Sequence, residues 1–190
     1  ADDCMIFCKS RKSAERTLNN ILPFIEGKLF LKVNRKKTKV SHISKVKYLG
    51  YTFYNKKGEM GIRVHQVSIK KLKGKLKSIT GRSNAMSMEI RAMKLKQLIV
   101  GWIGYFKLAD MKSTLRELDE WLRRRLRLCY WKQWKKIKTK HDNLVKLGVE
   151  NWKAWEHANT RKGYWRISNS PILATTLTNK YLREQGFITL

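Results

Sequence analysis

Two features of this sequence combine residue types and spacing that suit chemistry. The first is the pair Asp2-Asp3, which stands directly before an apolar run at residues 4–8. Two carboxylates ahead of a strand can hold Mg²⁺ for phosphoryl or nucleotidyl transfer. Such a pair is also common in turns, so the pair by itself leaves a structural role open.

The second feature is a basic stretch with interleaved aromatic residues at 121–140. Nine of these residues are lysine or arginine and none is acidic. Cationic side chains neutralise phosphates, and aromatic faces stack on unpaired bases. The stretch therefore predicts a nucleic-acid surface, and RNA is the favoured ligand. The residues expected to bind it are Arg123, Arg124, Arg125, Arg127, Trp131, Lys132, Lys135, Lys136 and Lys138.

Helical spacing predicts which face of a helix carries this surface. Arg123, Arg127 and Trp131 are four residues apart and share one face of a helix, away from a leucine stripe at 115–129. The alternative interpretation is a solvated charged face with its tryptophans in the core. For each tryptophan of the stretch, both base stacking and core packing remain open.

The charge of the whole chain points to the same class of ligand. There are 43 Lys and Arg against 14 Asp and Glu, which gives a formal net charge of +29. Residues 1–62 hold 14 basic and 5 acidic side chains, and residues 63–190 hold 29 and 9. A compact domain with this excess repels itself, and a polyanion relieves the repulsion. Because no apolar run reaches the roughly 18 residues of a membrane span, no membrane partner is predicted.

The cysteines and histidines offer no metal-binding pattern. Cys4, Cys8 and Cys129 lack the paired spacing of a zinc site, and the four histidines are scattered. Free thiols suit a reducing compartment, so a cytoplasmic location is expected. The first residue is Ala1, not Met, and the strand expected at residues 4–8 has no partner before it, which suggests a fragment of a longer protein.

Periodicity predicts an α+β beginning and a helical remainder. Residues 4–8, 28–33 and 46–54 read as strands, the last with a hairpin partner at 60–64. Ser13 is the expected cap of an intervening helix, which Pro23 should kink or end early. The turn Asn55 to Gly58 would close the hairpin.

From about residue 65 the apolar spacing becomes helical. One helix is expected along Ile69 to Ile79, a second after a cap at Ser87, and a third after a capping box that begins at Thr114. Gly101 and Gly104 inside the second helix predict either a close helix–helix approach or a helix break. A short helix at 152–157 and another begun by Ser170-Pro171, with a stop at Gly186, complete the tail.

Several motifs resemble the reverse transcriptases of group II introns, in the expected order over nearly the whole chain. Ala-Asp-Asp-Cys-Met-Ile-Phe at 1–7 looks like the Tyr-Ala-Asp-Asp metal motif without its tyrosine. Leu31-Lys32-Val33-Asn34 with Lys37-Thr38-Lys39-Val40, and Tyr48-Leu49-Gly50-Tyr51, are similar to the next palm motif and the primer grip. Gly-Trp-Ile-Gly-Tyr-Phe at 101–106, followed by Leu-Asp-Glu-Trp-Leu-Arg at 118–123, resembles the thumb or maturase-specific region. Ser-Pro-Ile-Leu at 170–173 resembles the family's tail.

The resemblance implies a fold, a function and site residues. The expected fold is α+β: part of a reverse-transcriptase palm at 1–62, built of antiparallel strands plus a helix, then an all-α helical-bundle thumb at 63–145 and a helical tail at 146–190. The implied function is RNA-directed DNA synthesis together with intron RNA binding for splicing. Asp2 and Asp3 become catalytic Mg²⁺ ligands, Lys37 lies near the incoming nucleotide, and Leu49, Gly50 and Tyr51 seat the primer. The implied partners are group II intron RNA and an RNA template–DNA primer duplex.

Departures from the family limit this expectation. The fingers, the upstream palm strands and the first metal-binding aspartate of the family are not found in these residues, and two-metal chemistry needs that further carboxylate. The chain alone is therefore expected not to polymerise. The alternative function is a non-catalytic RNA-binding cofactor of splicing. A generic basic RNA-binding protein would not need the ordered motifs at 1–54.

Overall fold

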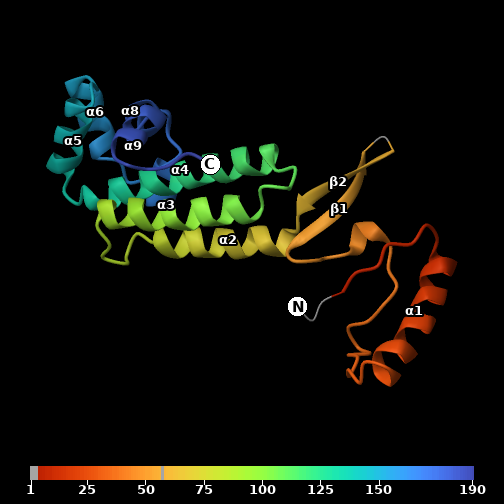
Figure 1. Cartoon of the computed structure of the whole chain (residues 1–190). Coiled ribbons are helices and arrows are strands. Elements are labelled where there is room, and N and C mark those ends of the chain that lie inside the picture. Colours follow the sequence, from red (N-terminus) through yellow and green to blue (C-terminus); the bar gives the residue numbers. More distant parts are fainter. Residues whose placement is uncertain (1–3, 57) are drawn as a thin grey trace. The chain divides into compact units, whose positions relative to one another are not determined.

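The computed structural model describes residues 4–56 and 58–190, and within them the chain is α+β (Figure 1). Helices dominate, and a two-stranded antiparallel sheet is present. The chain divides into two compact units. The first comprises residues 1–65 with 108–110, and the second comprises residues 66–107 with 111–190. The assignment of these units to a palm and a thumb stays a prediction.

The first unit begins with coil and one exposed helix, α1 (Arg11–Gly27). Its N-cap is Ser10, not the predicted Ser13, whose N–H is donated to the Ser10 hydroxyl at 3.2 Å. The helix continues past Pro23 to Gly27, so the predicted early end is wrong. Pro23 is exposed, as is Asn19, and the Asn19 carbonyl that loses its partner can be hydrated.

Two of the predicted strands are wrong. Residues 4–8 and 30–34 are coil, although both segments contain alternating or continuous apolar residues. A strand is stable only beside a hydrogen-bonded neighbour, and the described residues provide none for either segment. Their apolar side chains are therefore exposed: Phe7 to 61 % and Phe30 to 87 %.

The predicted hairpin is confirmed, with shifted bounds. β1 (Tyr51–Lys56) pairs with β2 (Glu59–Val64), from Tyr51 opposite Val64 to Lys56 opposite Glu59. Gly58 closes the turn with φ +91°, and its N–H is donated to the Asn55 side chain at 2.9 Å. The short 3₁₀ helix η1 (Ile43–Lys45) precedes the hairpin. The Tyr54 hydroxyl donates to the carboxylate of Asp110 at 2.7 Å, which ties residues 108–110 to this unit.

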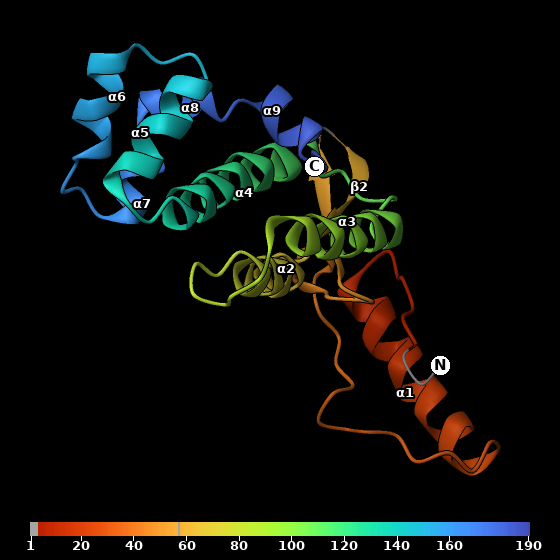
Figure 2. The ribbon, with the colours of Figure 1, turned by 90° about the vertical axis from the view of Figure 1, so that its left-hand side faces the viewer.

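The second unit is built on α2 (Gln66–Ile79), α3 (Met88–Tyr105) and α4 (Lys112–Gln133), and α2 packs against both of the others (Figures 1 and 2). The predicted stripes form its core. The most deeply buried side chains of these helices are Leu72, Leu76, Leu95, Ile99, Leu118, Leu122, Leu126 and Trp131. Burial of several such side chains contributes about 1.5–3 kcal/mol each, which outweighs the repulsion between neighbouring lysines in the lysine-rich turns.

Helix starts in this unit were predicted with mixed success. Ser87 caps α3 as expected and accepts the N–H of Ile90 at 3.3 Å. α4 begins at Lys112, a turn before the predicted capping box at Thr114, and its cap residue Met111 makes no side-chain cap bond. Met111 is buried, so packing of its side chain favours the earlier start.

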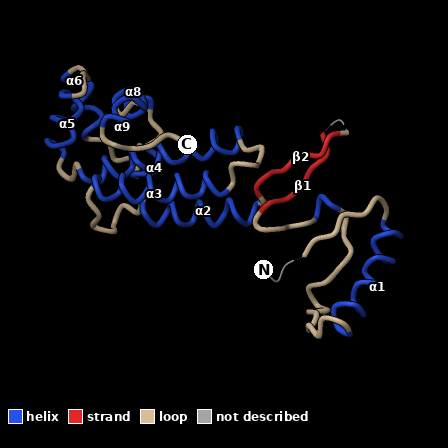
Figure 3. Tube along the Cα trace, in the orientation of Figure 1, coloured by secondary structure: helices blue, strands red, loops and turns tan. Residues whose placement is uncertain are grey.

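Short helices complete the second unit, and Figure 3 shows that it consists of helices and loops. Ser170 caps α8 as predicted, with Pro171 in its first turn. The chain then forms one more helix before Gly186, whose φ is +83°. These helices are α5 (Ile137–Lys146), α6 (Asn151–Ala158), α7 (Tyr164–Ile167), α8 (Pro171–Thr176) and α9 (Asn179–Glu184).

Neither prediction for the two glycines of α3 is correct. Gly101 and Gly104 lie within the helix, which ends only at Tyr105. A Cβ added at either position would meet no atom of the described residues within 4 Å, so no helix among them approaches these glycines closely.

Candidate nucleic-acid interface

Arg125 of α4 joins two helices instead of facing solvent. Its Nε donates to the Thr80 hydroxyl at 2.5 Å, and its terminal nitrogen donates to the carbonyls of Thr80 at 2.9 Å and Lys77 at 3.3 Å. These acceptors are the last carbonyls of α2 and the residue after it, where the helix dipole favours a cation. Burial lowers the pKa of Arg125. Most of its donors are therefore used inside the protein.

Arg123 and Arg127 are covered by the C-terminal part of the chain. Arg123 forms an ion pair with Asp119, and Arg127 donates from Nε to the carbonyl of Leu177 at 3.3 Å. Asp119 is also buried and accepts the N–H of Leu190 at 3.1 Å. Burial, then repulsion from Arg183, lowers the pKa of Arg123.

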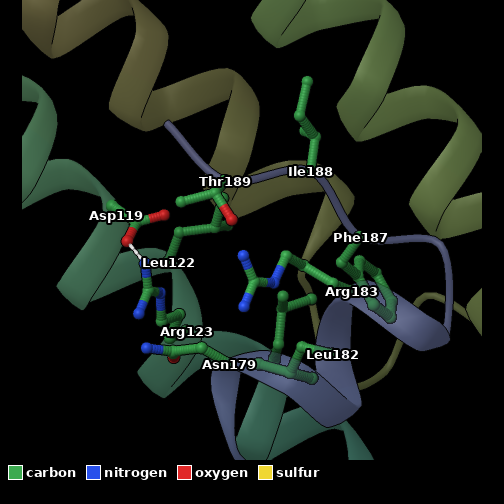
Figure 4. Close-up of a pocket in the computed structure, with 10 residues that line it drawn as sticks. Asp119, Leu122, Arg123, Asn179, Leu182, Arg183, Phe187, Ile188 and Thr189 are labelled. Carbon is green, nitrogen blue, oxygen red and sulfur yellow. Dashed lines mark ion pairs between the residues drawn. The ribbon is translucent and has the colours of Figure 1, made fainter.

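The space beside this ion pair is not a ligand site. Figure 4 shows the Asp119–Arg123 pair beside Arg183 and the C-terminal segment, with a lining drawn from α4, α9 and residues 187–189. The enclosed cavity is about 10 Å³, which holds roughly one water molecule. The arrangement fastens the end of the chain to α4.

The prediction that the face of α4 with Arg123, Arg127 and Trp131 is free to bind RNA is therefore wrong. Trp131 contradicts it most clearly. Trp131 is 1 % exposed and lies edge-on to Trp134, with 5.9 Å between ring centroids. A ring in that position cannot stack on a base. The leucine stripe packs on one side of α4, and the tail covers the face that carries Arg123 and Arg127. Sequence periodicity predicted the packing of the leucine stripe but not the contact with the tail.

The cations that remain at the surface are mainly lysines. In α2, five lysines flank the buried stripe and are exposed, and that helix contains no acidic residue. At the start of α5 and just before it, three of the predicted residues are also exposed. The two groups are Lys70, Lys71, Lys73, Lys75 and Lys77 in α2, and Lys135, Lys136 and Lys138 near α5. Lys132 is half-buried.

The predicted polymerase residues all lie in the first unit or before its described part. Lys37 is exposed in a turn in which the N–H groups of Lys37 and Thr38 donate to the Asn34 carbonyl. Leu49 and Gly50 have φ of +49° and +85°, and Tyr48 and Tyr51 exchange hydrogen bonds of 3.0 and 2.8 Å. Leu49 to Tyr51 therefore form a tight hairpin turn leading into β1, not the continuous strand predicted over 46–54.

Asp2 and Asp3 lie outside the described residues. Within 4–56 and 58–190, no group of three His, Cys, Asp or Glu side chains is placed to hold a metal ion.

One cation–aromatic cluster was missed by the sequence reasoning. Tyr164 and Trp165 of α7 lie against three cations, two from α4 and one from the loop between α2 and α3. Arg124 lies 3.8 Å above the Trp165 ring, and Arg82 and Lys132 each lie 5.2 Å from the centroid of Tyr164. The available signal was the segment Arg-Lys-Gly-Tyr-Trp-Arg at 161–166, which alternates the same residue types as the basic stretch.

The main helices of the second unit match the model of a known protein family. Residues 69–148 match the family model described as group II intron, maturase-specific domain. The sequence resemblance to a group II intron maturase or reverse transcriptase is confirmed there. The match spans α2, α3, α4 and α5, and it supports a role in group II intron splicing.

Two other findings concern the chain more broadly. No curated protein matches it. Among the described residues, no helix combines the length and the apolar character needed to cross a membrane.

Proposed function

We propose that this chain binds group II intron RNA and assists its splicing, with the lysines of α2 and of the start of α5 contacting phosphates. The observation that carries the proposal is the exposed lysine surface of α2 inside the segment that matches the maturase-specific domain. Five exposed cations on a helix of 14 residues without an acid repel one another unless a polyanion lies alongside.

The same lysines indicate how the RNA is held. Lysine is a flexible point charge that suits phosphates and carries little base specificity. Lys70, Lys73 and Lys77 follow the buried residues of α2 by one position and form a continuous row. The row would follow an RNA backbone, while the buried stripe beside it keeps the helix in place.

Replacing that row tests the proposal. The triple variant Lys70→Gln, Lys73→Gln and Lys77→Gln removes three charges without touching the core. Its affinity for an in vitro transcribed group II intron RNA should fall at least about tenfold at physiological salt. The slope of log affinity against log salt should fall by about 2–3, because each neutralised phosphate contributes roughly 0.9.

A matched control changes the same charge elsewhere. Lys9, Lys12 and Lys28 are exposed lysines beside or in α1, and their triple Gln variant should keep both affinity and slope. Electrophoretic mobility shifts over a salt series measure both quantities. Equal losses in the two variants would show a response to net charge alone, and an unchanged α2 variant would remove α2 from the interface.

RNA-directed DNA synthesis by a complete enzyme is the second proposal. It is supported by the ordered palm motifs at 1–54 and by the apolar surface that the first unit leaves uncovered. α1 buries none of its residues, and Phe24 and Leu31 are 50 % and 58 % exposed. Such side chains suit packing against further palm elements of a longer protein, of which this chain would be a fragment.

The metal chemistry belongs to that complete enzyme. Carboxylate oxygens are the ligands that Mg²⁺ prefers, and Asp2 and Asp3 would supply two of them beside a third carboxylate from elsewhere. An RNA template–DNA primer duplex would then contact the turn at Leu49 to Tyr51. The non-catalytic splicing cofactor remains the alternative, and it needs only the lysine surface.

A further inference from the structure

The short helix α7 presents two aromatic rings, and both are bordered by cations from distant parts of the sequence. Trp165 is 40 % exposed although the Arg124 guanidinium lies only 3.8 Å from the centre of its ring. Arg124 also donates to the Trp165 carbonyl at 2.8 Å, which holds the guanidinium in place. Much of the indole therefore remains accessible with a cation already stacked against it.

Tyr164, the neighbouring residue, lies close to two more cations. Arg82, from the loop between α2 and α3, and Lys132, near the end of α4, are each 5.2 Å from its ring centroid. Bringing two cations to one ring costs electrostatic free energy, which a bound anion would offset.

Three other cations, all exposed, belong to the same short segment as the two rings. Arg161, Lys162 and Arg166 flank the two aromatic residues. Within the described residues, none of the six cations named around α7 takes part in an ion pair with a carboxylate. We call this set of six cations with Tyr164 and Trp165 the α7 patch.

We infer that the α7 patch binds an unpaired segment of RNA, with a base stacked on the accessible part of Trp165 and neighbouring phosphates on Arg82 and Lys132. The inference rests on the proposed RNA binding and adds a second site, whose two aromatic residues lie outside the residues matched by the family model. A duplex keeps its bases stacked inside the helix, so an exposed indole bordered by cations favours a loop or a single strand.

Another exposed tryptophan shows what distinguishes the α7 patch. Trp152 of α6 is 63 % exposed, more than Trp165. Its cation, Lys153, lies 5.0 Å from the ring but is paired with Glu150 at 2.8 Å. Exposed Glu156 follows in the same helix. The mixed charge makes this ring a poor place for a phosphate chain, so Trp152 serves as the matched control.

The test compares one unstructured RNA oligonucleotide with the blunt duplex that it forms with its complement. Fluorescence anisotropy with the full chain gives both affinities. Trp165→Ala should weaken single-strand binding about tenfold, within the range of one base–aromatic stack, and leave duplex binding unchanged. Trp165→Phe should retain binding, and Trp152→Ala should leave both affinities unchanged.

Two further measurements make the result independent of any loss of structure. The Arg124 bond to residue 165 is to the backbone carbonyl, so Trp165→Ala can retain it, and circular dichroism melting curves check that the chain stays folded. The double variant Arg82→Gln and Lys132→Gln should lower the salt slope for the single strand by about 1.4, because each phosphate of a single strand contributes roughly 0.7. A 2-aminopurine base in the oligonucleotide should be quenched by the wild type but not by Trp165→Ala.

The possible results distinguish a failure of the proposed RNA binding from a failure of base stacking at the α7 patch. If the wild-type chain binds neither RNA, the proposed function fails. If it binds both but Trp165→Ala keeps single-strand affinity, or loses duplex affinity equally, the α7 patch is not a base-stacking site. Binding of polyglutamate that is lost in Trp165→Ala would assign the patch to acidic polypeptides and overturn the inference.

Discussion

Arg125 provides the sharpest test of the finding that α4 uses its arginines internally. Replacing Arg125 with Met keeps the unbranched apolar part of the side chain and removes the guanidinium. The Thr80 carbonyl would keep only the weak thiol donor of Cys129, at 3.4 Å, and the Lys77 carbonyl would lose its arginine partner. Thr80 is fully buried, so water cannot easily take the place of the lost donor.

The expected cost follows from these contacts. Hydrogen bonds to a charged group contribute about 1.5–3 kcal/mol each, and part of that is recovered by rearrangement, so we expect a loss of about 3 kcal/mol. Arg116 lies on the same helix and is exposed. Arg116→Met should change the free energy of unfolding by no more than about 0.5 kcal/mol.

Urea unfolding followed by tryptophan fluorescence measures this difference cleanly. All seven tryptophans lie between residues 102 and 165, so the signal reports the second unit alone. The midpoint for Arg125→Met should fall while the slope with urea stays unchanged. If the variant unfolds at the wild-type urea concentration yet binds intron RNA about tenfold more weakly, Arg125 contacts RNA and the structural reasoning is wrong.

Two further predictions concern titration and catalysis. His141 is stacked on Trp155 and hydrogen-bonded to Asp142 and Asn151, and the Asp142 bond is the larger cause of its raised pKa. Because the folded pKa is raised above 6.5, its stabilising contribution is present below that pH and lost as pH rises through the folded value. NMR titration should place the pKa of Asp142→Asn lower than that of the wild type, and an equal pKa would exclude the carboxylate as the cause. In a complete polymerase that joins this chain to fingers and a further palm aspartate, Asp2→Asn with Asp3→Asn should abolish primer extension and leave RNA affinity nearly intact, whereas retained extension would exclude both as metal ligands.

Helices were predicted well where one face had a strong apolar period. The stripes of α2 and α4 identified buried Leu72, Leu76, Leu118 and Leu122 correctly, because a spacing of three and four residues leaves a helix only one way to bury them. Strands were predicted poorly in the first unit. An alternating pattern such as that of residues 28–33 becomes a strand only beside another strand, and sequence alone does not report whether that neighbour is present.

The candidate nucleic-acid interface was likewise predictable only in part. The sequence by itself determined that the chain is strongly cationic, that its cations are mixed with aromatic residues, and that residues 69–148 match the model of a maturase-specific domain. Only the tertiary structure decided which cations are available. A helix such as α4 has more than one face, and the tail that covers its second face is some 50 residues away in sequence, as Arg127 and Leu177 illustrate. Contacts with the tail and within α4 occupy Arg127 and Arg123, which the sequence predicted to be free for RNA. The same tertiary structure places Arg82, Lys132 and Arg124 beside the rings of α7.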